Sequence, residues 1–126
     1  MPNAIALNCG AYRLYKDNLE KQEDLPLLYC FLDNVNDETR QLVSPYYFIT
    51  EKFPPTFIMS CNGDILIEDY SYMKEMLEKK GVKTVGNFYG TEKEPLFHVF
   101  HCDIRNATAK VCNKEEIDFF RKNMKS

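Results

Sequence analysis

Residues 53–64 read Phe53-Pro54-Pro55-Thr56-Phe57-Ile58-Met59-Ser60-Cys61-Asn62-Gly63-Asp64, an apolar, β-prone run that stops at a turn. An amphipathic helix is predicted over residues 70–80, and Gly81 suits the position just after a helix C-terminus. A second strand is predicted over 82–89, and the loop after it contains His98. This order of strand, turn, helix and strand predicts two parallel strands joined by a crossover helix.

Asp64 and His98 follow the two predicted strands and are the candidate site residues. The carboxyl ends of neighbouring parallel strands lie at the same edge of a sheet, so we expect the two side chains to meet there. A carboxylate that orients an imidazole is half of a Ser-His-Asp triad. Each residue also has a structural explanation, because aspartate is common in turns and a histidine among apolar neighbours is often a satisfied structural group.

The rest of the chain predicts one α/β domain over residues 1–126. A third strand is predicted over 4–8, which is almost wholly apolar and ends at Cys9-Gly10. Further helices are predicted over 26–32, over 37–43, and from residue 113 or 114 to 122. We therefore expect about three mainly parallel strands flanked by helices on both faces. Apolar residues at 44% and charged residues at 28% are typical of a globular protein.

Several short motifs resemble the C-terminal part of an α/β-hydrolase of the hormone-sensitive-lipase-like esterase and lipase family. They occur in matching order and spacing: Ala4-Ile5-Ala6-Leu7-Asn8-Cys9-Gly10-Ala11-Tyr12, Ser44-Pro45-Tyr46, Pro54-Pro55-Thr56, Asp64-Ile65-Leu66, Lys79-Lys80-Gly81-Val82 and His98-Val99-Phe100. The resemblance implies a partial α/β-hydrolase fold in which residues 15–53 form a small cap-like insertion. It also implies that Asp64 and His98 are the acid and the histidine of the triad, with His101 as a weaker candidate.

The insertion has two interpretations. In a complete esterase such a cap shapes the acyl pocket, and the residues that could line one here are Leu28, Phe31, Leu32, Tyr46, Tyr47 and Phe48. The alternative, which we favour, is that these residues fill the core or cover the sheet, because aromatic clusters in a small domain usually serve packing.

The chain departs from the family in lacking a nucleophile. Members carry a Gly-x-Ser-x-Gly elbow and a glycine-rich oxyanion loop, but none of the four serines has glycines at the required positions: Ser44, Ser60, Ser71 and Ser126. Cys9 and Cys61 fail the same test. We therefore expect no carboxylic ester hydrolysis from this chain alone, and a small ester as substrate only with a complementing nucleophile half. The alternative is a noncatalytic oligomerisation or interaction domain derived from an esterase.

Composition limits the partners and the location. The net charge of −3 argues against a nucleic-acid surface. No apolar run reaches the roughly 20 residues that span a bilayer, and no secretory signal opens the sequence, so a cytoplasmic location is expected. Five cysteines without a Cys-x-x-Cys pair indicate reduced thiols, and neither a metal nor a cofactor is expected. The strand over 4–8 would be an uncovered edge, which favours a homo-oligomer.

Overall fold

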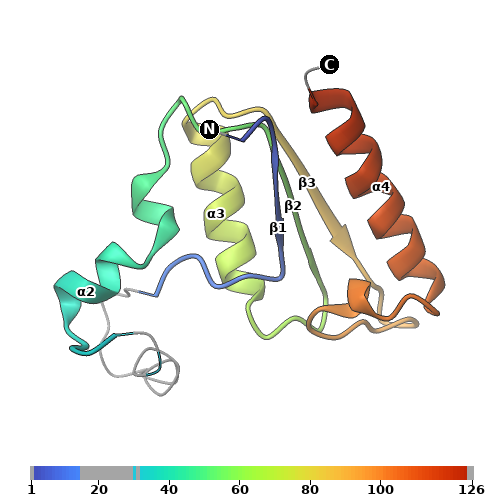
Figure 1. Cartoon of the computed structure of the whole chain (residues 1–126). Coiled ribbons are helices and arrows are strands. Elements are labelled where there is room, and N and C mark those ends of the chain that lie inside the picture. The colour runs from blue at the N-terminus through green and yellow to red at the C-terminus, as the bar shows by residue number, and fades with distance from the viewer. Residues whose placement is uncertain (1, 15–29, 31, 125–126) are drawn as a thin grey trace.

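The fold is built on a single sheet of three parallel strands (Figure 1), seen in a computed structural model that describes residues 2–14, 30 and 32–124. The strand order is β1 (Ile5–Asn8), β2 (Thr56–Cys61) and β3 (Thr84–Tyr89). Both pairs of neighbouring strands are parallel. The predicted α/β class, with parallel strands and helices on both faces of the sheet, is confirmed.

The central strand β2 is buried along its whole length. Its side chains alternate between the two faces, and each face packs against a helix. Phe57 and Met59 belong to one core cluster, and Ile58 belongs to the other. A strand that is covered on both faces carries apolar residues without interruption, which explains the unbroken apolar run in this part of the sequence.

Helix α3 (Ile67–Lys79) covers one face of the sheet, and helix α4 (Ala107–Asn123) covers the other (Figure 1). Met73 and Leu77 bring α3 into one cluster, while Cys112 and Phe119 bring α4 into the other. Helix α2 (Asp37–Leu42) and the 3-10 turn η1 (Pro45–Phe48) lie on the α3 side. A second 3-10 turn, η2 (Phe100–Cys102), precedes α4.

The strand β1 is half-buried, and among the described residues its hydrogen-bonded neighbour is β2, on one side. The amides of Ile5 and Cys9 donate to carbonyl oxygens next to or within β2. Since hydrogen-bonding direction alternates along a parallel strand, the backbone groups of Ala6 and Asn8 point away from β2. In the described part of the chain this edge of the sheet carries no further strand.

Two predicted helix starts were wrong. Helix α3 begins at Ile67 rather than at residue 70, with two acidic residues in its first turn that favour the positive end of the helix dipole. Helix α4 begins at Ala107 rather than at 113 or 114, because the Asn106 side chain accepts hydrogen bonds from two backbone amides and caps the helix there. Helix α2 starts as predicted, after the cap residue Asn36.

The insertion over 15–53 lies partly outside the described residues, and so do Leu28, Phe31 and most of the helix predicted over 26–32. Tyr46 packs against the core cluster on the α3 side. Tyr47 and Phe48 are exposed. Both interpretations of the insertion, the acyl pocket and the favoured packing role, therefore stay predictions. No helix in the described ranges is long and apolar enough to cross a membrane.

Candidate functional site

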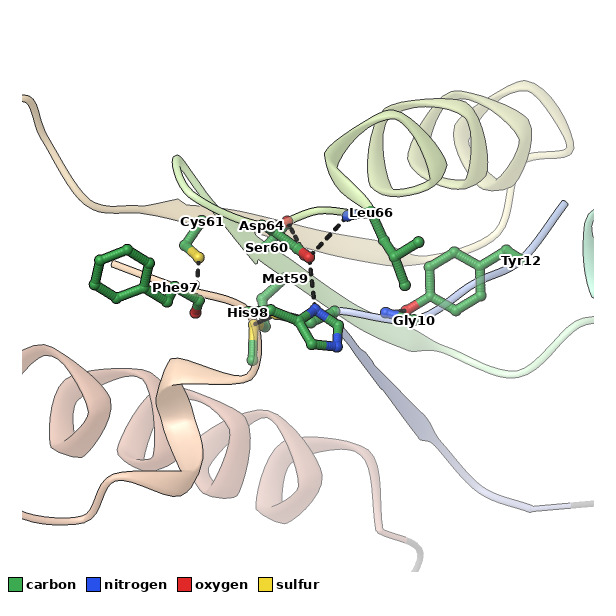
Figure 2. A network of polar contacts seen from close by, with 10 residues as sticks. Gly10, Tyr12, Met59, Ser60, Cys61, Asp64, Leu66, Phe97 and His98 are labelled. Carbon is green, nitrogen blue, oxygen red and sulfur yellow. Dashed lines mark hydrogen bonds and ion pairs between the residues drawn. The ribbon is translucent and has the colours of Figure 1, made fainter. Parts of the chain in front are cut away.

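Asp64 and His98 lie in direct contact at the carboxyl edge of the sheet. Asp64 follows the turn after β2, and His98 lies in the loop after β3. Their atoms Oδ1 and Nδ1 are 2.7 Å apart (Figure 2). The structure thus brings together the two residues that the sequence selected. Their catalytic role stays a prediction.

Asp64 is a buried carboxylate that accepts hydrogen bonds from several donors, the Cys9 thiol among them. Its Oδ2 accepts a hydrogen bond of 2.6 Å from the Ser60 hydroxyl. Its Oδ1 accepts one of 3.0 Å from the Leu66 amide and also contacts Nδ1 of His98. Burial alone would raise the pKa of the carboxyl group, but these hydrogen bonds outweigh burial and lower the pKa below its ordinary value of 3.8. Asp64 is therefore ionised at neutral pH.

Sequence reasoning missed Ser60 as a part of this site. Its signal was a hydroxyl near the end of a mostly apolar strand, four residues before the aspartate. A buried hydroxyl needs a hydrogen-bond partner, and here the partner is the carboxylate. Because the Ser60 hydroxyl donates to Asp64, this serine supports the acid rather than serving as a nucleophile for His98.

His98 presents its second nitrogen away from Asp64 (Figure 2). The imidazole is 35% exposed, while the side chain of Asp64 is fully buried. An ionised carboxylate accepts hydrogen bonds only, so Nδ1 carries the proton in the neutral ring and the lone pair is on Nε2. A cavity of about 330 Å³ adjoins the residue and is lined by Leu96, Phe97, His98, Val99, Phe100 and Asp103 among others. This arrangement suits a general base.

The turn after β2 and the loop before His98 are tied to each other. The Leu96 amide donates to Asn62 Oδ1 over 3.0 Å, and the Cys61 thiol donates to the Phe97 carbonyl over 3.3 Å. Gly63 forms a parallel bridge with Phe97. A Cβ atom at position 63 would overlap the carbonyl oxygen of Leu96, so only glycine permits this approach. These contacts fix the distance between Asp64 and His98.

Cys9, the residue after β1, is the third member of the site. One ligand atom each from Cys9, Asp64 and His98 lies within 4.8 Å of the other two. The thiol is buried, and burial raises its pKa to about 12 although a hydrogen bond to the Val99 backbone lowers it. Cys9 is therefore a protonated thiol at neutral pH and a poor nucleophile.

Backbone strain is concentrated at this site. Among the described residues, Cys9 with φ of 49° and Val99 with φ of 55° are the non-glycine residues with positive φ. A left-handed conformation is costly for a β-branched residue such as Val99, on the order of 1–3 kcal/mol. Strain of this kind persists where the surrounding structure enforces it, and it is often found at functional sites.

The weaker candidate His101 does not pair with Asp64. Its Nε2 lies 3.7 Å from the Cys102 sulfur, and its Nδ1 is buried without a partner. Burial lowers the pKa of this imidazole, although Glu116 acts in the opposite direction. The residue that Asp64 orients is His98.

Comparison with known proteins adds no relative, because no protein-family model, no curated protein and no solved structure matches the chain. The function must therefore be argued from the site itself.

Proposed function

We propose that the chain carries the acid and base of a Ser-His-Asp hydrolase site of the α/β-hydrolase type and does not hydrolyse carboxylic esters alone. The single observation that carries this proposal is the contact of 2.7 Å between the buried Asp64 carboxylate and Nδ1 of a half-exposed His98. Both residues follow the carboxyl ends of neighbouring parallel strands. This placement supports the relation to esterases that the sequence motifs suggest.

The proposed chemistry needs a hydroxyl nucleophile from a complementing polypeptide. His98 Nε2 takes the proton of that hydroxyl while the oxygen attacks the ester carbonyl, and Asp64 stabilises the imidazolium that forms. The imidazolium then returns the proton to the leaving alcohol, which leaves the acyl group on the nucleophile. Water, deprotonated by His98 in the same way, releases the carboxylic acid and restores the hydroxyl. The cavity beside His98 gives room for a small carboxylic ester.

Two parts of such a site are missing from the chain as its sequence stands. The serines do not lie in an elbow motif, and the five glycines are scattered rather than grouped in an oxyanion loop. Losing a single oxyanion donor lowers kcat about 100- to 1,000-fold in a serine protease. Without a nucleophile as well, we expect turnover at the level of the uncatalysed reaction.

The test is an ester-hydrolysis assay with short p-nitrophenyl esters. The purified chain is assayed alone and mixed with a polypeptide that carries a glycine-rich loop and a Gly-x-Ser-x-Gly elbow. We expect no turnover from the chain alone, and turnover in the mixture that His98→Ala and Asp64→Ala each abolish. Activity of the isolated chain that disappears in His98→Ala would overturn the inactive assignment. Activity in the mixture that survives both substitutions would overturn the acid and base roles.

The second candidate is a noncatalytic oligomerisation domain, favoured by the open edge of β1. Unpaired backbone groups at an edge strand are a template for pairing with another chain. A stable oligomer that no nucleophile-bearing polypeptide activates would favour this function over the first.

We further propose that the chain works in a reducing compartment such as the cytoplasm. None of the five cysteines is joined in a disulfide, and three are buried and two exposed. Disulfides persist in oxidising compartments and are rare where thiols are kept reduced, so exposed cysteines outside disulfides fit the latter.

A further inference from the structure

Cys9, Asp64 and His98 offer three different ligand atoms at one point of the sheet edge: a sulfur, a carboxylate oxygen and an imidazole nitrogen. Each residue follows a different strand, and the three atoms lie within 4.8 Å of one another. Cys9 and Asp64 are buried, and His98 is half-exposed. We propose that these residues bind one zinc ion.

The spacing is close to that of a zinc site. Tetrahedral zinc with bonds of about 2.0–2.3 Å holds its ligand atoms about 3.3–3.8 Å apart. The pair Nδ1 and Oδ1 is closer than this, at 2.7 Å, and no distance among the three ligand atoms exceeds 4.8 Å. Side-chain adjustments of about 1 Å therefore suffice for zinc geometry.

The donor set selects the class of ion. Magnesium and calcium prefer oxygen ligands, whereas thiolate together with imidazole suits zinc and similar first-row ions. Three protein ligands with the fourth position left to water is the pattern of accessible zinc sites rather than closed structural ones. Of the three residues, His98 is half-exposed and lines the cavity, so an ion would enter past this side chain.

The surroundings of Asp64 are suited to a metal ligand. The Ser60 hydroxyl and the Leu66 amide already fix the orientation of the carboxylate, as outer partners of metal ligands do. The ion would replace the hydrogen bond between Asp64 and His98, and the proton that Nδ1 carries in the neutral ring would move to Nε2, because a metal ligand must present a lone pair. Binding would also release the proton of the Cys9 thiol to the buffer, and the carboxylate and thiolate would together balance the charge of Zn²⁺.

This inference does not depend on the proposed function. The spacing of the cysteines along the sequence predicted no metal site. The cluster found here contains a single cysteine, Cys9, and its other members, Asp64 and His98, lie 55 and 89 positions further along the chain. Zinc and the acid–base arrangement compete for the same atoms. Zinc would therefore inhibit a complemented hydrolase if both proposals hold.

The experiment measures metal binding by the full chain after treatment with a chelator. Zinc is titrated calorimetrically, and cobalt(II) serves as a spectroscopic substitute whose charge-transfer band reports a thiolate ligand. We expect one ion per chain, a thiolate-to-cobalt band, and no binding of magnesium at the same concentration. Cys9→Ser should remove the band, and His98→Gln should weaken zinc binding about tenfold or more.

The matched control is the pair of partly buried His101 and exposed Cys102, which is a second cysteine and histidine close in space. His101→Gln and Cys102→Ser should leave the stoichiometry and the cobalt band unchanged. The proposal is overturned if the wild-type chain binds no zinc, or if the band survives Cys9→Ser and is lost in Cys102→Ser. Circular dichroism of each variant shows whether it folds. If Cys9→Ser does not fold, Cys9→Ala is used in its place.

Discussion

Ser60 supports the candidate site at the level of a single hydrogen bond. Its hydroxyl lies in the buried strand β2 and donates to Asp64 Oδ2 over 2.6 Å. A hydrogen bond to a buried charged group contributes more to stability than a hydrogen bond to a neutral group. The reason is that an ionised carboxylate without partners is costly away from water. Ser60 therefore links the stability of the sheet to the ionisation of Asp64.

Ser60→Ala should destabilise the chain by about 1–3 kcal/mol, because the carboxylate loses a donor that water cannot easily replace. The measurement is the free energy of unfolding in urea at neutral pH on protein free of metal. Ser71→Ala is the control, since the Ser71 hydroxyl is on the exposed side of α3 and bonds to the Ile67 carbonyl rather than to a buried charge. Equal losses in the two variants would contradict the role given to Ser60.

The lowered pKa of Asp64 predicts a dependence of stability on pH. A carboxyl group whose pKa is lower in the folded than in the unfolded chain stabilises the fold above the unfolded pKa, close to 3.8. That contribution is lost as the pH falls through the lower folded pKa. Urea unfolding of metal-free protein should therefore show a steeper loss of stability in acid for the wild type than for Asp64→Asn.

Asp118→Asn is the control for this acid titration. The pKa of Asp118 is also lowered, first by the hydrogen bond from Lys114, but the carboxyl is at the surface of α4 and solvent screens its interactions. Asp118→Asn should therefore lose stability in acid as steeply as the wild type does. An Asp64→Asn curve parallel to the wild-type curve would show that Asp64 is not the group responsible.

At the scale of elements, the turn after β2 and the loop after β3 behave as one unit. Gly63→Ala should separate them, because the added methyl group overlaps a backbone oxygen that cannot rotate away. Overpacking of this kind costs about 1–3 kcal/mol. Gly86→Ala is the matched control, since its methyl group would meet the flexible Lys74 side chain. Urea unfolding should rank Gly63→Ala as the more damaging change, and the reverse order would refute the coupling.

The sequence predicted the elements whose signals are local. The apolar run of β2, the amphipathic pattern of α3 and the glycine after it identify one unit, and Gly81 does adopt a positive φ of 71°. The start of α4 was missed because residues 107–112 include β-branched Thr108 and Val111, which weaken a helical pattern. Packing decides there, since Ala109 and Cys112 are fully buried against the sheet.

The site was predictable only in part, for a similar reason. Strand order was enough to bring Asp64 and His98 to one edge, because a parallel sheet aligns its carboxyl ends. Cys9 was judged by a local glycine pattern and set aside, although it follows a predicted strand just as the other two residues do. Its role depends on a neighbour relation between β1 and β2, and the sequence alone does not give this relation.

At the scale of the whole molecule, the open edge of β1 predicts self-association into a dimer or larger oligomer. Light scattering on the purified chain at micromolar concentration measures its mass in solution and hence its oligomeric state. Ala6→Pro should shift the population toward monomer, because it removes an outward-pointing amide without breaking a bond to β2. Ile117→Ser, at an exposed position of α4, should not change the mass. A wild-type chain that elutes as a uniform monomer would contradict the prediction.

The meeting of three strand ends at one cluster also bears on how the chain folds. Cys9, Asp64 and His98 are brought together only after both crossovers have closed, so their contact is among the least local in the chain. Helix formation in α3 or α4 can precede it. An absorbance signal from a cobalt ion held by these residues would consequently time the completion of the sheet, whereas helical circular dichroism would time earlier steps.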